Sequence, residues 1–386
     1  MRLQRVTTAG RWIPEIDGLR FIAIFSVLLV HIFDQMISHS SSRVALTDTH
    51  RELFDNMNLL GRGVQLFFVI SGFILAQPFI RDYVDGGKPV SIRAFYKRRL
   101  TRLEPPYIFS LIIYASAMIL ARGAKIKAVA LSSLSSLFYV HNFFSWLPPI
   151  NFPAWSLEIE IQFYLIFPFL ALIYLIRPTL LRRGLIVALI LFAAMSPHAT
   201  TDGIGFYLPG QICFFLIGNL LADLRISQRT SNIHWGWDVV SVFSWAALFL
   251  VPNRADSVLL CVLLFLCFCS SLLGPVSRRI VGTRWIALIG GMCYSIYLMH
   301  MIVISAVFGL TRHASHFNSV VVNYLIQLVL LLPPILAVSF VYYLLIERPC
   351  MNPDWPSKLW SSLIARHRHD ECPPSPAVPD APPSES

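Results

Sequence analysis

The chain has 386 residues, of which 56% are hydrophobic and only 13% are charged. A soluble domain carries about 25% charged residues, so this chain has too little polar surface to cover a water-soluble globule. The composition therefore excludes a soluble enzyme, a disordered chain and a nucleic-acid-binding domain. It favours an all-α polytopic membrane protein, in which the formal net charge of +10 resides mainly in cytoplasmic loops.

A helix that spans a membrane needs about 20 mostly apolar residues. Ten apolar runs predict about ten transmembrane helices, at 19–37, 64–81, 105–122, 158–176, 184–196, 206–224, 237–252, 257–274, 285–309 and 319–346. The last run contains Pro333–Pro334, where we expect a kink. Residues 127–141 are weakly apolar and rich in serine, which predicts a surface or re-entrant helix.

Arginines precede the first apolar run, as they do in a signal peptide. No small-residue cleavage site follows that run, so we expect it to be retained as a helix. With the N-terminus in the cytoplasm, 23 of the 31 Lys and Arg residues lie on the cytoplasmic side of ten helices. Because cytoplasmic loops are rich in Lys and Arg, this asymmetry predicts that both termini are cytoplasmic.

The last residues of the chain differ in composition from the rest. The stretch 371–386 is rich in Pro and Ser and cannot form a core. We therefore predict a membrane domain at 1–350 and a cytoplasmic tail at 351–386, disordered from about 371. The seven cysteines show no Cys-x-x-Cys or Cys/His spacing, so we expect packing residues and no metal site.

Two polar residues of the first helix stand out, because ionisable groups inside a membrane are costly and often functional. Arg20 and His31 are 11 residues apart, about three helical turns, so they share one face. A histidine transfers protons near neutral pH, which makes His31 a candidate catalytic base. The alternative is a histidine hydrogen-bonded to a neighbouring helix, with Arg20 as an anchor at the inner boundary.

The second and third runs carry a small-residue pair and a basic cluster. Ser71–Gly72 lies inside an apolar helix, where small residues permit close helix packing. Arg98, Arg99 and Arg102 come just before Pro105, where we expect a helix boundary. Forked guanidinium groups suit phosphates, either those of a phosphorylated cofactor or those of lipid headgroups.

Carboxylates open the fourth run. Ser156 is the predicted N-cap of this helix. Glu160 and Tyr164 are four residues apart and share a face. Glu158 lies about 200° away from Glu160, so the two carboxylates are not expected to form an acid/base pair.

The ninth run contains a second intramembrane histidine, His300. The alternative to a functional role for His300 is a satisfied polar contact.

Taken together, these stretches resemble acyltransferase family 3, the membrane O-acyltransferases that modify bacterial glycans and some small molecules. The resemblance extends from about Ile16 to Pro349. The motifs that carry it follow the order of the family, on Arg20 and His31, Gly63–Phe73, Phe95–Pro105, Trp155–Tyr164, Tyr294–His300 and Glu347–Pro349. One departure is visible, because Ile161 stands where family members often have a second glutamate after the one matched by Glu160.

The resemblance implies a donor, an acceptor and a location. The donor is an acyl-CoA, expected to be acetyl-CoA, which enters from the cytoplasm as a substrate, and no cofactor is permanently bound. The acceptor is a hydroxyl of a cell-surface glycan or lipid-linked sugar, and the location is the bilayer of the bacterial inner membrane. Some members append a soluble SGNH domain after the last helix. The stretch after residue 350 is too short for one, so we expect the membrane domain or a separate partner to complete transfer.

The resemblance also implies roles for individual residues. The implied catalytic residues are His31, as the base, together with Arg20 and the motif glutamate Glu160. Donor binding falls on Arg98, Arg99 and Arg102, and the expected pocket residues are Ser71, Tyr164, Tyr297 and His300. Two alternatives remain open at this point. One is a transporter or flippase of a sugar or amphipathic solute, and the other is an O-acyltransferase of a macrolide or lipid.

Overall fold

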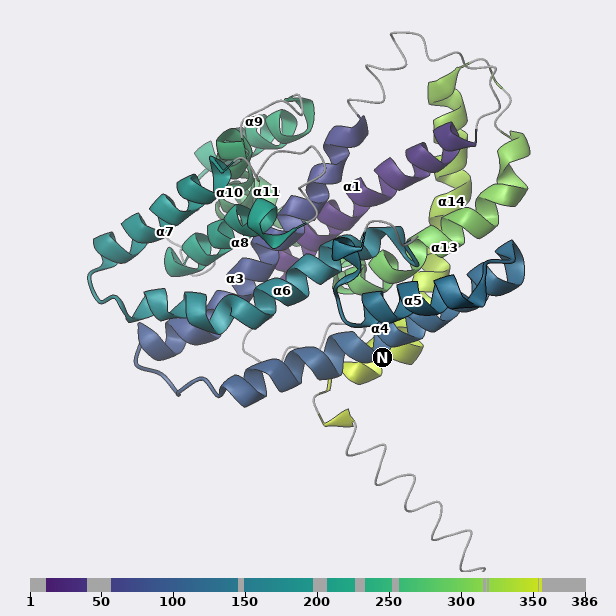
Figure 1. Cartoon of the computed structure of the whole chain (residues 1–386). Coiled ribbons are helices and arrows are strands. Elements are labelled where there is room, and N and C mark those ends of the chain that lie inside the picture. The colour runs from purple at the N-terminus through teal and green to yellow at the C-terminus, as the bar shows by residue number, and fades with distance from the viewer. Residues whose placement is uncertain are drawn as a thin grey trace, which may run out of the picture.

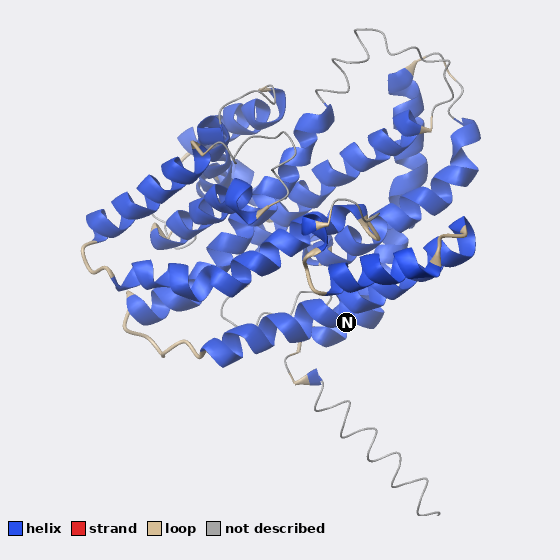
Figure 2. Ribbon diagram, viewed as in Figure 1, coloured by secondary structure: helices blue, strands red, loops and turns tan. Residues whose placement is uncertain are grey.

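The computed structural model describes residues 12–39, 57–144, 149–196, 207–225, 233–251, 257–314, 317, 319–352 and 354–355. In these ranges all regular elements are helical (Figure 2). This confirms the prediction of an all-α protein. The disordered tail predicted from about residue 371 lies outside the described residues.

The helices form one elongated bundle, in which segments from both halves of the sequence lie side by side (Figure 1). The longer helices are α1 (Pro14–Ser38), α3 (Gly63–Tyr83), α4 (Ile92–Arg122), α13 (Cys293–Thr311) and α14 (Val320–Tyr342). The shorter helices are α5 (Ile126–Leu137), α6 (Trp155–Leu170), α7 (Thr179–Ala194), α8 (Leu208–Asp223), α9 (Gly236–Leu250), α10 (Ser257–Leu273), α11 (Pro275–Val281), α12 (Arg284–Gly291) and α15 (Arg348–Cys350). Single turns are η1 (Leu59–Arg62), η2 (His141–Phe143), η3 (Phe152–Ala154), η4 (Ala171–Leu175), η8 (Arg312–Ala314) and the π-helical η9 (Tyr343–Glu347).

The described residues contain fewer helices that could span a membrane than the ten apolar runs predict. Within the described ranges, six helices are long and apolar enough to cross a membrane, or seven if α10 and α11, bent by 91°, count as one broken span. Helices α8 and α9 have 16 and 15 residues, so each is only about 24 Å long or shorter. A hydrocarbon core is about 30 Å thick, so ten spans are not confirmed.

The predicted helix boundary at Pro105 is wrong, because α4 continues through Pro105 and Pro106. Pro105 has no N–H, which leaves the carbonyl of Thr101 without its donor in the helix. Trp355 supplies that donor, because its indole Nε1 donates to the Thr101 oxygen at 2.9 Å. The hydroxyl of Tyr342 donates to the Pro106 carbonyl and so joins α14 to this part of α4. The side chain of Trp355 therefore replaces the bond that Pro105 removes, and the basic cluster lies inside one long helix.

Three other predicted stretches can be compared with the structure. The serine-rich stretch is indeed a short helix, α5, whose 12 residues are about 18 Å long and pack against α4. The ninth apolar run is broken at Met292, so that α12 and α13 are separate helices. Helix α14 is assigned as continuous through Pro333 and Pro334, followed directly by the π-helical turn η9.

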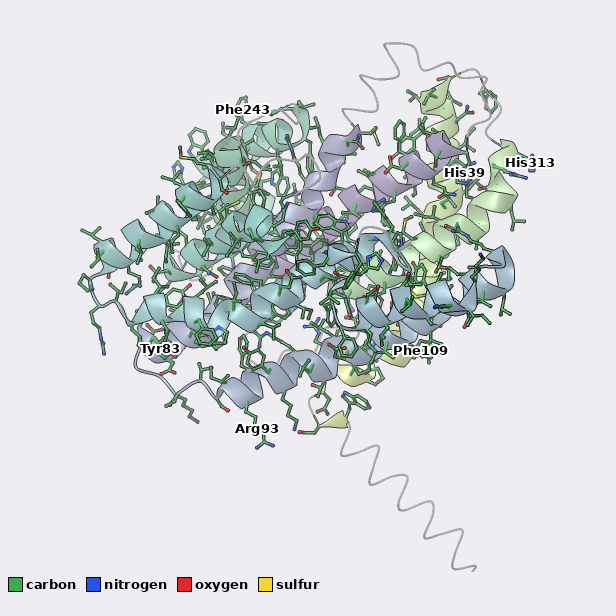
Figure 3. All side chains as sticks on the ribbon, viewed as in Figure 1. His39, Tyr83, Arg93, Phe109, Phe243 and His313 are labelled. Atoms are coloured by element: carbon green, nitrogen blue, oxygen red, sulfur yellow. The ribbon has the colours of Figure 1, made fainter. Side chains whose placement is uncertain are left out.

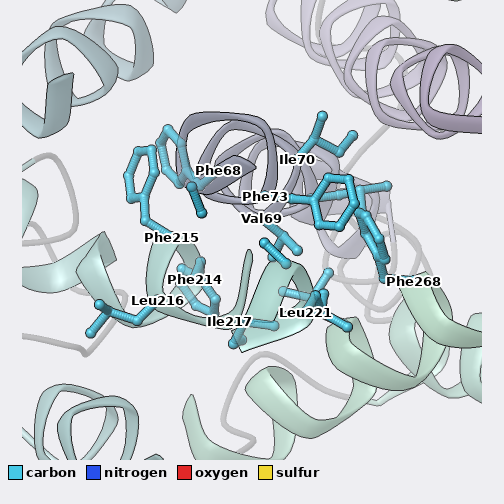
Figure 4. Packing of buried hydrophobic residues seen from close by; sticks show 14 of the residues in the cluster. Phe68, Val69, Ile70, Phe73, Phe214, Phe215, Leu216, Ile217, Leu221 and Phe268 are labelled. Carbon is cyan, nitrogen blue, oxygen red and sulfur yellow. The ribbon is translucent and has the colours of Figure 1, made fainter. Parts of the chain in front are cut away.

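Glycines allow α3 and α8 to pack closely at the centre of the larger core (Figure 4). A Cβ added at Gly72 would collide with the carbonyl of Phe215, and one at Gly218 would collide with the carbonyl of Val69. Aromatic rings fill the space beside this contact, where Phe68 stacks on Phe215 with centroids 4.6 Å apart. The prediction that Ser71–Gly72 permits close helix packing is confirmed at Gly72.

The outside of the bundle is apolar, as lipid contact requires. Large side chains that are 70–87% exposed include Leu120, Phe169, Leu180, Phe192, Phe243 and Leu310. Phe109 and Phe243 lie on the outer surface (Figure 3). Five cysteines, in contrast, are buried, which confirms that these are packing residues: Cys213, Cys261, Cys267, Cys269 and Cys350.

The chain enters α1 and leaves the last helix at the same end of the bundle. Trp12 and Met351 line one cavity together with Arg98. The prediction that both ends of the membrane domain lie on the cytoplasmic side remains to be tested. Reporter fusions within 38–63 should report the outer side, and fusions after Arg348 should report the inner side. A fusion after Arg348 that reads as external would contradict this topology.

Candidate active site

A cavity of about 370 Å³ lies among α1, α3, α4, α6 and α13. Ligand sites in proteins commonly measure roughly 300–1,000 Å³, so this volume is sufficient for a small molecule or part of a larger one. Its wall carries five arginines and two acidic residues: Arg20, Arg81, Arg98, Arg99, Arg102, Asp17 and Glu160. This excess of positive charge inside an apolar bundle favours an anionic ligand.

The predicted basic cluster of α4 belongs to this cavity. Arg98, Arg99 and Arg102 all line it. The guanidinium carbon of Arg99 lies 3.6 Å from the ring centre of Phe95 and 5.5 Å from that of Tyr164. Its Nη1 donates to the Phe95 carbonyl at 2.8 Å. Two aromatic rings and one hydrogen bond thus hold the Arg99 charge in place.

The guanidinium group of Arg102 makes fewer contacts than that of Arg99. Its Nη2 lies 3.9 Å from Oε1 of Glu347, which is too far for a hydrogen bond. The buried Nε of Arg102 and Oε1 of Glu347 have no hydrogen-bond partner among the described residues. The other oxygen of Glu347 accepts from the backbone N and the Oγ of Ser295, at 3.0 and 2.6 Å. Glu347 therefore caps the first turn of α13, while Arg102 keeps hydrogen-bonding capacity for a ligand.

Glu160 connects α6 to α3 in the cavity wall. Its Oε1 accepts hydrogen bonds from the hydroxyls of Ser71 and Tyr164. The predicted shared face of Glu160 and Tyr164 is therefore confirmed. Glu158 has a different partner, because its Oε2 accepts from the backbone N of Asn142 at 2.9 Å. As expected, the two carboxylates are not paired.

Arg20 also faces the cavity, but its partner is an acid of its own helix. Its Nη1 donates to Oδ1 of Asp17, whose Oδ2 accepts from Nε1 of Trp12 at 2.8 Å. A Cβ added at Gly290 would collide with the Asp17 carbonyl, so α12 packs directly against this turn of α1. Arg20 thus points to the cavity end of α1, about three turns away from His31.

His31 lies outside the cavity wall and beside His300, the second intramembrane histidine. The ring centroids of His31 and His300 are 5.3 Å apart, with planes 29° apart. His31 also faces Phe152 edge-on, with centroids 6.1 Å apart. Its Nδ1 is 3.9 Å from Oδ2 of Asp34, whose side chain is 42% exposed. The structure therefore places Arg20 and His31 in two adjoining regions.

Tyr297 stands between these two regions. It lines the cavity, and its ring centroid is 6.4 Å from that of His300. Its hydroxyl donates to the Pro153 carbonyl and lies 3.0 Å from Oγ of Ser156. The prediction that Ser156 is the N-cap of α6 is wrong, because the helix begins at Trp155. Ser156 contacts Tyr297 instead. Tyr297 thereby joins α13 to the start of α6.

Sequence reasoning missed two carboxylates of this site. Asp17 sits three residues before Arg20 on the same helix face, so its pairing was readable from spacing alone. Glu347 appeared only as part of a motif. Its contacts with Arg102 and Ser295 join α4 and α13, and no local pattern predicts such a contact.

The apolar exterior, the six or seven helices that could span a membrane and the arginine-lined cavity together define a multi-pass membrane protein with a cationic cavity. The model of the acyltransferase domain of family 3 matches residues 13–344, so the chain belongs to this family. The resemblance inferred from the sequence motifs is thereby confirmed. No solved structure matches the chain.

Related chains support the same assignment. A protein of Staphylococcus aureus (strain COL), named provisionally as an O-acetyltransferase, is 26% identical over 333 residues. That match covers 77% of this chain and 51% of the relative, and a second protein from strain MSSA476 matches equally. The O-acetyltransferase OatA of Staphylococcus aureus (strain NCTC 8325 / PS 47) is 27% identical over 168 residues, or 41% of this chain and 24% of OatA. The chain spans about half the length of the first of these relatives.

Proposed function

We propose that the chain is an O-acyltransferase of the bacterial inner membrane. It moves an acyl group, most simply acetyl, from acyl-CoA to a hydroxyl of a cell-surface glycan or lipid-linked sugar. The observation that carries this proposal is the juxtaposition of an arginine-lined cavity with a pair of histidines just beyond its wall. Membership of the acyltransferase family and the printed names of the relatives support the same chemistry.

The donor side rests on the basic cluster. Coenzyme A carries several phosphates, and guanidinium groups bind phosphate through charge-assisted hydrogen bonds. Arg99 is fixed between two rings, whereas the Nε of Arg102 has no partner among the described residues. A phosphate in the cavity supplies the acceptor that Arg102 lacks. In this arrangement the nucleotide lies toward the α4 end, and the thioester lies toward Tyr297.

The transfer step requires a base and a stabilised oxyanion. His31 removes the proton of the acceptor hydroxyl, whose oxygen then attacks the thioester carbonyl carbon. Arg20, held by Asp17 in the cavity wall about three turns from His31, adds positive charge to the donor cavity. The oxyanion is stabilised by a polar group that faces His31. The carbon–sulfur bond breaks, and the coenzyme leaves as a thiol. Glu160 holds Ser71 and Tyr164 in the wall and so keeps the shape of the donor cavity.

Replacement of Arg102 by alanine tests the donor site. Loss of charge-assisted hydrogen bonds worth about 1.5–3 kcal/mol should weaken acyl-CoA binding about tenfold or more. The measurement is the affinity of the purified variant for acetyl-CoA. Arg93 is the matched control, because it lies on the same helix, is exposed and does not line the cavity (Figure 3). We expect the Arg93→Ala protein to bind the donor normally.

Unchanged donor affinity in Arg102→Ala would make the cluster a topology anchor or a lipid-headgroup site.

Assays of acetyl-CoA hydrolysis and acyl transfer by the wild-type protein distinguish the candidate functions. A transporter or flippase should neither hydrolyse acetyl-CoA nor transfer its acyl group. An acyltransferase of a macrolide or lipid shares the donor chemistry and differs in the acceptor that becomes acylated.

A further inference from the structure

His300 comes from a distant part of the chain and lies directly against His31. The two imidazoles approach within 5.3 Å, centre to centre, where α13 packs against α1. His300 is fully buried, whereas His31 keeps a small exposed fraction. A buried imidazole is costly in an apolar bundle unless it makes a structural bond or carries out chemistry.

The hydrogen bonding of His300 fixes which ring nitrogen carries the proton. Its Nδ1 lies 2.9 Å from the backbone carbonyl of Ile296, one turn earlier in α13. A carbonyl oxygen only accepts, so Nδ1 is the protonated donor and Nε2 of the neutral ring bears the lone pair. This buried Nε2 has no hydrogen-bond partner among the described residues. The structural bond therefore occupies one nitrogen and leaves the basic one unpaired.

The position of His300 relates the histidine pair to the donor cavity. Tyr297, three residues earlier on α13, lines that cavity, and its ring is 6.4 Å from the ring of His300. His31 contacts the other face of this junction, where Phe152, 52% exposed, precedes the Pro153 that Tyr297 bonds. The ring of His300 is therefore a neighbour of both Tyr297 in the cavity wall and His31. His300 thus links the place proposed for the thioester to the base proposed for the acceptor.

We propose that His300 relays a proton from His31 to the leaving thiolate of the donor. This inference rests on the proposed function. As the acceptor O–H bond breaks, its proton goes to His31, and the acceptor oxygen bonds to the acyl carbon. The carbon–sulfur bond then breaks, and its electron pair stays on sulfur. The proton passes from His31 to Nε2 of His300 and on to that sulfur, so the products are the ester and the thiol, and both histidines end neutral.

Electrostatics favours a relay between the two histidines rather than two bases that act independently. Two positive charges at this separation in an apolar interior repel strongly, so the pair holds at most one extra proton at a time. The other ionisable groups near the pair are Asp34, on the exposed side of His31, and the hydroxyl of Tyr297. A proton on His31 is therefore stabilised mainly when His300 shares it or accepts it.

The test compares His300→Asn with two other variants in vesicles that contain a lipid-linked sugar extract of the host and acetyl-CoA. Asparagine places its amide N–H near the position of Nδ1, so the bond to the Ile296 carbonyl is retained while the basic Nε2 is removed. We expect the turnover number for ester formation to fall by about 100-fold, the lower range for loss of an acid/base group. The KM and Kd for acetyl-CoA should stay within about twofold of the wild-type values.

The companion variants isolate the role of the proton. His300→Gln, whose amide oxygen accepts a hydrogen bond but holds no proton at neutral pH, should be as slow as His300→Asn. His39→Asn is the matched control, because His39 also faces a ring of α13, that of Phe308, but lies at the exposed end of α1. It should transfer at the wild-type rate.

Two results would overturn the relay. One is a turnover number of His300→Asn within about threefold of the wild type. The other is a loss of turnover that is accompanied by an equal loss of donor affinity and of thermal stability, which marks a structural role. A wild-type protein that binds acetyl-CoA but forms no ester overturns the proposed function itself, and the relay with it.

Discussion

Replacement of His31 by glutamine is expected to reduce acyl transfer by about 10²–10⁴-fold, the usual contribution of a general base. Glutamine keeps a polar side chain of similar size but does not accept a proton at neutral pH. Because His31 lies outside the arginine-lined cavity proposed to bind the donor, acetyl-CoA should still bind with wild-type affinity. The measurements are ester formation by the purified protein, complementation of a deletion strain, and donor binding.

His39→Gln is the control for this experiment. His39 lies just beyond the C-terminal end of α1 and is exposed, so its replacement leaves the helix and the histidine pair intact. If His31→Gln retained near-normal transfer, His31 would be a structural residue. His300 and Glu160 would then be the better candidates for the base.

Asp223→Ala is expected to give the largest loss of stability. The Asp223 carboxylate at the end of α8 accepts from Nε of Arg182 at 2.8 Å and from Nε of Arg183 at 2.6 Å, both on α7. Asp223 and Arg182 have side chains only 1% and 4% exposed. Removal of one partner of a buried ion pair leaves the other charge without compensation, at a cost of about 3–5 kcal/mol. The free energy of unfolding in mild detergent, or the melting temperature, measures this loss.

The chain offers a matched surface pair. Asp85 pairs with Arg225, and their side chains are 36% and 40% exposed. Exposed pairs contribute about 0–1 kcal/mol, so Asp85→Ala should be close to the wild type in stability. Equal stability losses in the two variants would show that burial of the Arg182–Asp223 pair adds nothing to the fold.

The sequence predicted the helical class and most helix positions, because apolar runs in a membrane can satisfy their backbone only as helices. The number of spans that it predicted is not confirmed, and hydropathy alone does not distinguish contact with lipid from contact with protein. Helix α8 illustrates this point, since 12 of its 16 residues are buried by neighbouring helices. Its composition is that of a spanning helix, although its 16 residues are shorter than the thickness of a hydrocarbon core.

Local rules also failed at Pro105, and for a physical reason. Proline removes a backbone donor, which normally ends or kinks a helix. Here the indole of Trp355, from the far end of the chain, bonds to the carbonyl of Thr101 that Pro105 leaves free. Only the tertiary structure brings that donor to α4.

The candidate site also has some features that the sequence predicts and others that only the tertiary structure shows. Fixed spacing along single helices determined that Glu160 and Tyr164 meet and that Arg98, Arg99 and Arg102 gather at one place. Spacing also put Arg20 and His31 on one face. It did not reveal that packing of α12, α4 and α6 places Arg20 in the wall of the arginine-lined cavity, while packing of α13 places His300 beside His31.

The sequence by itself therefore determined which chemical groups are present and which share a helix, because helical periodicity depends on nearest neighbours along the chain. The tertiary structure decided which groups face one another across helices. The contacts of Glu347 with Arg102 and of His31 with His300 join residues far apart in sequence. Such contacts follow from the close packing of whole helices, at sites such as Gly72 and Gly290, and no short segment of the chain encodes them.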